Sequence, residues 1–255
     1  MAEILSLRRR PPGDLTALVR SPELAGLVRP ASADPSRGGI GERVLPLLPE
    51  LRALFPGGGL RRGSTVAVST GGTDPFGAAS VLLALLAAAS AAGSWCAVVG
   101  LPTLGLAAAA EFGIALDRLA LVPTPGPEWP SVVGALLDGI DVVAVAPSGP
   151  VSAAIAGRLA ARARHRGGVL IPYGRWTGAD VVLETPGGGW QGLGAGHGRL
   201  SRRVLVVSRQ GRGAAVRRLE AAVAIPWHPV HEHPAPAPAS GATGSRTPTA
   251  LEAAG

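Results

Sequence analysis

The hydrophobic positions of this chain first become regular near residue 65, where a short apolar run leads into a glycine-rich turn and a long apolar segment. Residues 65–69 (TVAVS) are typical of a buried strand, because small and β-branched residues follow one another without a charge. Residues 75–92 predict a helix that Gly93 ends as a C-cap. Residues 95–99 (WCAVV) then predict a second buried strand.

Segments of helix length and strand length continue to alternate along the chain. Helices are expected over residues 106–111, 129–137 and 151–165, and strands over residues 119–122, 140–146 and 169–172. Three further strand-like runs, joined by glycine-rich turns, follow at residues 180–184, 190–193 and 203–208. The pattern therefore predicts an α/β fold, in which helices flank a mostly parallel sheet and the C-terminal strands are antiparallel.

Proline and glycine are frequent on both sides of this regular pattern. Residues 1–54 predict an N-terminal arm with short helices over 13–18 and 43–54, and residues 55–220 predict the core. Residues 221–255 are rich in Pro and Ala and predict a disordered tail, because they can bury little apolar surface. His228, His231 and His233 lie in this tail between prolines, and we interpret them as incidental rather than as metal ligands.

The turn after the first strand has the layout of a phosphate-binding loop without its chemistry. Gly72 and Gly77 have the spacing of the pattern G-x-x-x-x-G-K-[ST]. Ala78 and Ala79 stand where the lysine and the hydroxyl residue belong. Asp74 precedes a proline, the residue preferred at the first position of a helix, so its carboxylate would occupy the electropositive helix end. We hypothesise that Asp74 closes the loop with its own anion; the alternative is an ordinary capping residue.

Basic and acidic residues are unevenly distributed along the chain. The net charge is +7, and all 24 basic residues are arginine. Residues 55–141 contain three Arg and six acids, whereas residues 142–179 contain five Arg and residues 199–218 seven Arg, both without an acid. A basic half suits a nucleic acid or an acidic protein as partner. A solvated basic surface is the alternative interpretation.

Cysteine content and hydropathy bear on the location of the protein. Cys96 is the single cysteine, so there is no disulfide framework and a reducing compartment fits. Residues 75–110 carry no charge, but glycine, serine and proline interrupt them. A buried helix followed by a buried strand explains this stretch better than a membrane-spanning helix of about 20 strongly apolar residues. A cytoplasmic protein is expected.

Residues 55–66 (FPGGGLRRGSTV) resemble the glycine-rich approach to the first core strand of RecA recombinases. The order of strands and helices that follows, through residue 208, is similar to that of the RecA ATPase core. Within this superfamily the degenerate form, rich in alanine and arginine, resembles ImuA-type proteins, the RecA-like accessory factors of the actinobacterial mutasome. The resemblance covers residues 55–213.

The resemblance implies that three sites of ATP chemistry have been lost. Besides the substitutions at Ala78 and Ala79, Leu101 falls nearest the place of the glutamate that activates water, and the Walker B strand ends in Ala146 instead of aspartate. Asp141 stands at the opposite end of that strand and is not expected to be a metal ligand. Phosphoryl transfer depends on positioning and charge neutralisation. We therefore expect no catalytic residue, no cofactor, no metal and no enzymatic activity.

By the same resemblance, the chain is expected to be a non-catalytic scaffold of DNA damage tolerance, associated with the nucleoid. Its expected partners are an ImuB-type inactive Y-family polymerase-like protein, an error-prone DnaE-type polymerase and RecA. Candidate contacts with a partner or with DNA are seven arginines in two groups: Arg158, Arg162 and Arg166, spaced by four, and Arg202, Arg203, Arg209 and Arg212. The alternative is that these arginines only confer solubility.

Three other functions stay open at this point. An atypical DNA-dependent ATPase would obtain its cation elsewhere, from Arg61 or Arg62. A directly DNA-binding RecA paralogue would use the arginine cluster in weak, salt-sensitive binding, although the loops at 146–150 and 174–178 are short for filament-style binding. An inhibitor of cell division resembling SulA is the third.

Overall fold

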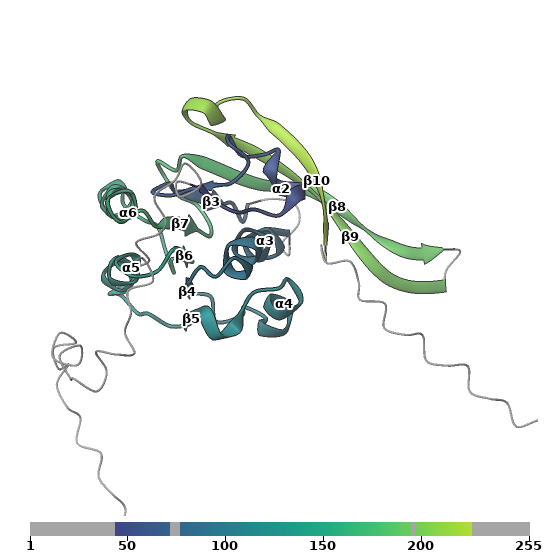
Figure 1. Ribbon diagram of the computed structural model, residues 1–255, viewed down its shortest axis with the longest axis horizontal. Helices are drawn as coiled ribbons and strands as arrows, with labels where there is room; N and C mark the ends of the chain where they lie inside the picture. The colour runs from purple at the N-terminus through teal and green to yellow at the C-terminus, as the bar shows by residue number, and fades with distance from the viewer. Residues whose placement is uncertain (1–43, 72–76, 195–196, 226–255) are drawn as a thin grey trace, which may run out of the picture.

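The computed structural model describes residues 44–71, 77–194 and 197–225, which form one twisted sheet with helices on both of its faces (Figure 1). Six strands run parallel at its centre: β5 (Leu119–Val122), β4 (Cys96–Val99), β6 (Val142–Val145), β7 (Val169–Pro172), β3 (Val66–Val68) and the first part of β8 (Val181–Gly194). The antiparallel strands β9 (His197–Gly211) and β10 (Leu219–Ile225) follow β8. The α/β fold with a mostly parallel sheet and antiparallel C-terminal strands is confirmed.

The strand β3 holds the two halves of the sheet together. On one side it pairs with β8, with Val66 opposite Val181 and Val68 opposite Leu183. On the other side, single parallel bridges join Thr65 to Leu170 and Val68 to Tyr173 of the β7 side. The order across the sheet is therefore β5-β4-β6-β7-β3-β8-β9-β10. The strand that leads into the glycine-rich turn lies near the middle of the sheet.

Two hydrophobic clusters, one on each face, hold the helices to the sheet. The helices α2 (Pro49–Arg52), α3 (Gly77–Ala91) and α4 (Leu106–Glu111) lie on one face, and α5 (Trp129–Leu137) and α6 (Ala153–Arg166) on the other (Figure 1). Alternate residues of each strand point to opposite clusters: Val142 and Ala144 of β6 to the first, Val143 and Val145 to the second. Both faces of these strands are buried, which explains their uninterrupted apolar sequence.

Glycine and serine fix the ends of the two longest helices. Gly93 has a φ of 93°, and Ser94 N donates to Ala89 O (3.0 Å) across the end of α3, so the predicted C-cap is confirmed. Ser152 Oγ accepts a hydrogen bond from Ile155 N (3.3 Å), so α6 begins at Ala153 rather than at residue 151. The expected ranges 106–111, 119–122, 129–137 and 169–172 agree with α4, β5, α5 and β7.

The glycine-rich region after residue 180 differs from the prediction. The runs 180–184 and 190–193 belong to one strand, β8, which passes through Pro186 and three glycines and forms a long ribbon with β9 (Figure 1). Pro186 falls at a shift of register between Glu184 and Gly187, where the ladder does not require its missing N–H. A Cβ at Gly188 would lie 2.7 Å from Val204 O, so glycine serves a close approach of the two strands and not a turn.

The boundaries of the core are also wider than predicted. Residues 44–54 were expected to belong to an arm, but Leu47, Leu48 and Leu51 are fully buried, and β1 (Val44–Leu45) pairs with β2 (Leu60–Arg61). The expected helix over 43–54 shortens to α2. At the other end, β10 continues to Ile225 and buries Val223, five residues into the expected tail, because it completes the sheet against β9. In the part of the chain that the structure describes, no helix is long and apolar enough to cross a membrane.

Candidate functional site

The carboxyl edge of the parallel sheet carries the three positions where ATP chemistry was expected to be lost. In open α/β sheets, ligands bind outside the carboxyl ends of the strands. Gly72 and Asp74 lie outside the described residues, as does the predicted capping of the helix by Asp74. Helix α3 begins at Gly77; Gly77 and Ala78 are buried and Ala79 is half-buried.

The side chains at these positions are apolar and are largely occupied by packing. Ala78 is 1% exposed and belongs to the hydrophobic cluster under α3, and Leu101 packs against the same cluster. Ala146 follows β6, and its N–H donates to Val99 O (2.8 Å). Gly100 approaches so closely that a Cβ there would lie 2.3 Å from Ala146 O. The structure thus brings the residues after β4 and β6 side by side, but a methyl and an isobutyl group can neither bind a metal nor transfer a proton.

The amino edge of the sheet carries an ion pair instead. Arg62 Nη1 donates to Asp141 Oδ1 (2.9 Å) and to Gly167 O (3.3 Å), and Asp141 Oδ2 accepts from Trp95 N (3.0 Å). Asp141 therefore lies at the end of β6 opposite Ala146, as expected, and ties the starts of β4 and β6 to the end of α6. Arg62, considered above as a replacement cation for an ATPase, lies with Asp141 at the edge opposite the glycine-rich turn.

Cys96 lies on β4 beside this ion pair and is completely buried. Burial raises the pKa of its thiol from 9.0 to about 12, with a smaller contribution from the charge of Asp141. A thiol of this kind is neutral at any physiological pH and is a packing residue, not a nucleophile.

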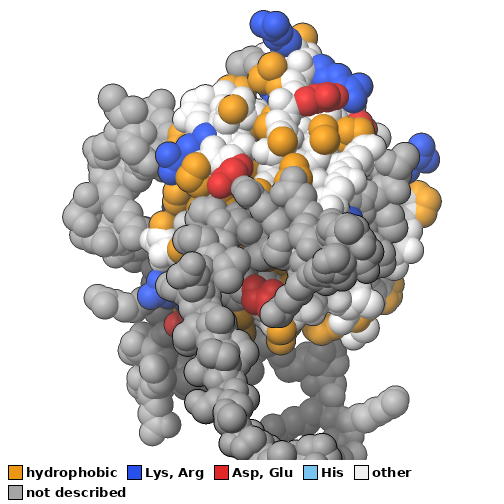
Figure 2. Space-filling view, turned by 90° about the vertical axis from the view of Figure 1, so that its right-hand side faces the viewer, with side chains coloured by type: hydrophobic (Ala, Val, Ile, Leu, Met, Phe, Trp, Pro, Cys, Tyr) orange, Lys and Arg blue, Asp and Glu red, His pale blue; other side chains and the backbone are white. Residues whose placement is uncertain are grey.

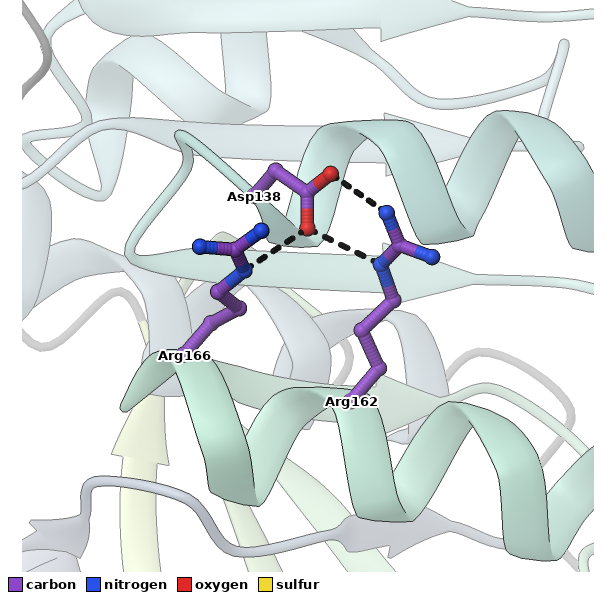
Figure 3. Close-up of polar contacts among 3 residues, drawn as sticks. All are labelled: Asp138, Arg162 and Arg166. Carbon is purple, nitrogen blue, oxygen red and sulfur yellow. Dashed lines mark hydrogen bonds and ion pairs between the residues drawn. The ribbon is translucent and has the colours of Figure 1, made fainter.

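The predicted arginine face of α6 is partly neutralised within the chain. Asp138, just after α5, accepts hydrogen bonds from Arg162 Nε (2.9 Å) and Nη2 and from Arg166 Nε (3.1 Å), so that it lies between the two side chains (Figure 3). The Arg162 hydrogen bonds, together with the charges of both arginines, hold the pKa of Asp138 below its ordinary value of 3.8. Arg158 is exposed and makes no ion pair with any described residue. Two of the three arginines therefore join α5 to α6.

The described side chains of the second predicted group of arginines differ in their surroundings. Arg209 is 3% exposed, because it follows Leu205 and Val207 on the core side of β9, so its prediction as a surface contact is wrong. The guanidinium of Arg203 lies 5.4 Å from the ring centre of Trp190, which is exposed on the ribbon. The side chain of Arg202 lies outside the described part of the structure. Arg212 is exposed on the segment after β9.

On the face of the molecule shown in Figure 2, the basic side chains of the described residues lie apart from one another, with acidic side chains between them. This face corresponds to the right-hand side of Figure 1, where the β8–β9 ribbon projects. The described part of this face therefore offers no continuous basic patch.

Three hollows that share lining residues lie near α6. The largest, about 610 Å³, lies at the carboxyl ends of β3, β6 and β7 and is lined by Tyr173, Arg175 and Trp176 among others. The second, about 360 Å³, lies beside α6 and shares Thr177 with the first. The third, about 330 Å³, lies at the amino edge near β2 and shares Arg164 and Arg212 with the second.

Most of the residues that line these hollows were not predicted from the sequence. Of the seven arginines predicted as contacts only Arg212 is among them; Arg61 and Arg62, considered above as replacement cations, and Arg164 and Arg175 line the hollows as well. Arg164 and Arg175 belong to the acid-free segment 142–179, which was the available signal. No cluster of three or more potential metal ligands occurs among the described residues.

Comparison with known proteins places the chain in a family. Residues 53–178 match the sequence model described as the MT3502 N-terminal domain. The uncharacterized protein Rv3395c of Mycobacterium tuberculosis is 38% identical over 145 residues, which cover 53% of this chain and 71% of that protein. The chain belongs to the MT3502 N-terminal domain family.

The matched residues of the MT3502 N-terminal domain run from the turn after α2 to the loop before β8. They include the degenerate loop, Leu101, Ala146 and the arginines of α6. Arg202, Arg203, Arg209 and Arg212 lie beyond them, on the ribbon and its return.

Proposed function

We propose that this chain is a non-catalytic, RecA-like accessory protein of DNA damage tolerance, of the ImuA type, that holds an error-prone translesion polymerase complex together through protein contacts. The observation that carries the proposal is the carboxyl edge of the sheet. There β3, near the middle of the sheet, and α3 flank the glycine-rich sequence, an order that resembles a nucleotide-binding fold, while Ala78, Leu101 and Ala146 supply apolar groups at the positions expected for ATP chemistry.

The packing around Ala78 and Ala146 supports the proposal beyond the identity of these residues. A lysine in place of Ala78 would have to leave a cluster in which the methyl group is fully packed. Gly100 and Ala146 approach so closely that the backbone leaves no room for a side chain at Gly100. Charge neutralisation and water positioning, on which phosphoryl transfer depends, have no donor at these positions.

The proposed partners are an ImuB-type Y-family polymerase-like protein and an error-prone DnaE-type polymerase, with RecA as a third. The proposed contact surface on the body of the protein is the outer face of α6. There Asp138 holds Arg162 and Arg166 in place and leaves Arg158 exposed (Figure 3). Arginines whose side chains are already ordered lose less entropy when an acidic partner binds. A nucleoid-associated location in the cytoplasm is part of the same proposal.

Affinity capture from cells treated with a DNA-damaging agent tests the proposal. The full chain and a form that ends after Ile225 should both recover the two polymerase-type proteins if the body carries the contacts. A form that ends near residue 220 is unsuitable, because it would remove most of β10 from the sheet. Arg158→Glu should reduce recovery, whereas Arg217→Glu, at an exposed position before β10, should not.

Two outcomes would contradict the proposal. Recovery of cell-division proteins without a polymerase would favour the inhibitor resembling SulA. Release of phosphate from ATP in the presence of DNA would favour the atypical ATPase. Calorimetric titration with ATP and Mg²⁺ provides an independent check, and we expect no tight binding.

A further inference from the structure

The arginines that line the two smaller hollows come from three separate segments. Arg61 lies on β2, Arg164 on α6, and Arg212 after β9. All three side chains are exposed, and none forms an ion pair or hydrogen bond with a described residue. The acidic residue beside them, Asp180, directs Oδ2 to Thr65 N (2.8 Å). Three arginine side chains without a described partner therefore line the third hollow together with one carboxylate, Asp180. That carboxylate already accepts a hydrogen bond from a backbone N–H.

Close contacts of two glycines position the segments that carry Arg164 and Arg212. Gly63 packs so tightly on α6 that a Cβ there would lie 3.1 Å from Arg164 Cα, and Gly63 N donates to Gly168 O (2.9 Å). A Cβ at Gly178 would lie 4.0 Å from Arg212 Nη2, so that guanidinium lies over the loop after β7. Both glycines have positive φ values, 78° and 81°, which other residues adopt only with strain. The arginines are thus held near one another by the fold.

The three hollows share lining residues from one to the next, and we call them together the arginine groove. The third hollow, with Arg61, joins the second through Arg164 and Arg212. The second joins the first through Thr177, beyond which lie Arg175 and the half-buried ring of Trp176. Trp176 is held edge-on by Trp129 at 6.4 Å between ring centres. Cations at successive points followed by an aromatic ring are the features of sites that bind single-stranded nucleic acids.

We propose that the arginine groove binds the phosphate backbone of a single nucleic-acid strand. The planar guanidinium group matches phosphate in two-point hydrogen bonds, which supports arginine at three positions along a path for a polyanion. Trp176 favours a strand over an acidic polypeptide, because an unpaired base can stack on an aromatic ring. It also favours a single strand over a duplex, whose bases are already stacked. This site is independent of the proposed protein contacts at Arg158.

Fluorescence anisotropy with a labelled dT20 strand and the full chain tests this inference. If three phosphates are neutralised, the affinity should fall by about 20-fold between 50 and 200 mM salt, since log K for single strands changes by about −0.7 per phosphate for each unit of log salt. Arg61→Ala, Arg164→Ala and Arg212→Ala together should abolish most of this salt dependence and weaken binding at 50 mM salt at least tenfold. Arg217→Ala removes an exposed arginine before β10, outside the groove, and should bind as the unchanged chain does.

A triple lysine variant and a competition experiment separate the effect of charge from misfolding, and a nucleic acid from an acidic protein. The triple lysine variant retains the charge, so it should keep the salt dependence even if the alanine variant is poorly folded. A polyglutamate of equal charge should compete at least tenfold less well than unlabelled dT20. Wild-type affinity of the triple alanine variant, an equal loss in Arg217→Ala, or equal competition by polyglutamate would each overturn the inference. The last result would assign the groove to an acidic protein.

Discussion

Arg62 and Asp141, 79 positions apart in the sequence, form an ion pair of 2.9 Å at the amino edge of the sheet. Only 10% of the Asp141 side chain is exposed, and its second oxygen accepts from Trp95 N. Replacement of one partner would leave the other charge partly buried without compensation. The pair therefore stabilises the junction of β4, β6 and α6, at the edge of the sheet opposite Ala146.

Asp141→Asn should lower the free energy of unfolding by about 2 kcal/mol, because it leaves Arg62 partly desolvated without its anion. Urea denaturation followed by circular dichroism measures the change. Asp117→Asn, at an exposed position without a described ion pair, is the matched control and should stay within about 0.5 kcal/mol. An equal loss of unfolding free energy in both variants would show that the ion pair between Arg62 and Asp141 does not account for the effect.

Cys96 should be inert in the folded protein. With a pKa raised to about 12, only about one thiol in 10,000 is ionised at pH 8, and the side chain is fully buried. Ellman's reagent should react at a rate limited by unfolding and become fast in denaturant. Since the chain has one cysteine, the measurement needs no assignment. Rapid reaction of the native protein at pH 8 would contradict the packing of β4.

The same thiol should affect stability at alkaline pH. A raised folded-state pKa means that the native state holds the proton more tightly than the unfolded chain does. The contribution of Cys96 is thus complete below its ordinary pKa of 9.0 and is lost as the pH rises toward about 12. Cys96→Ser, compared with the unchanged chain in thermal melts from pH 7 to 10, should show a weaker alkaline decline. If Tm declined equally with pH in both proteins, the alkaline loss of stability could not be assigned to Cys96.

Asp138→Asn should lower Tm by about 3 °C at most, because its ion pairs with Arg162 and Arg166 are largely exposed. The pKa of Asp138 is lowered in the folded protein, so this stabilisation is complete above the ordinary value of 3.8 and is lost as the pH falls through the lower folded value. The difference in Tm from the unchanged chain should be constant between pH 5 and 7 and shrink below it. It should also shrink in 1 M salt. If the difference in Tm persisted at acidic pH, the packing of the Asp138 side chain and not its charge would be the cause.

Gly100→Ala should be strongly destabilising, by more than about 2 kcal/mol, because the new methyl group would meet Ala146 O at 2.3 Å and the residue has a φ of 77°. Gly139→Ala is the matched control, since no atom lies within 4 Å of a Cβ there and its φ is not positive. Chemical denaturation of both variants checks the prediction. A neutral Gly100→Ala would mean that β4 and β6 can separate at the carboxyl edge.

The helices and strands between residues 95 and 172 were predictable because their boundaries are local. Gly93 and Gly167 end helices through their own positive φ values, and strands buried on both faces are uniformly apolar. The ribbon was not predictable in the same way. Glycines that allow Gly188 to approach Val204 look in the sequence like glycines of a turn. Only the pairing of β8 with β9 distinguishes the two cases.

The candidate site was predicted less completely, for a physical reason. The spacing of Arg158, Arg162 and Arg166 identified one side of α6, but sequence spacing could not reveal that Asp138 of the preceding helix neutralises it. Arg164, between them in the sequence, lies on the other side of α6 and meets Arg61 and Arg212 only through tertiary folding. Alternation along β9 would have indicated that Arg209 is buried, since Leu205 and Val207 precede it at intervals of two.

The pairing of β3 with β8 has a consequence for how the family domain can exist. The matched residues 53–178 stop before β8, yet β8 supplies the neighbour of the strand in the middle of the sheet. A fragment with these limits would turn β3 into an open edge with unpaired N–H and C=O groups, which invites aggregation. It would also lack Leu47, Leu48 and Leu51, which are buried in the intact core. The matched segment is thus an interior part of a sheet whose described strands extend from Val44 to Ile225.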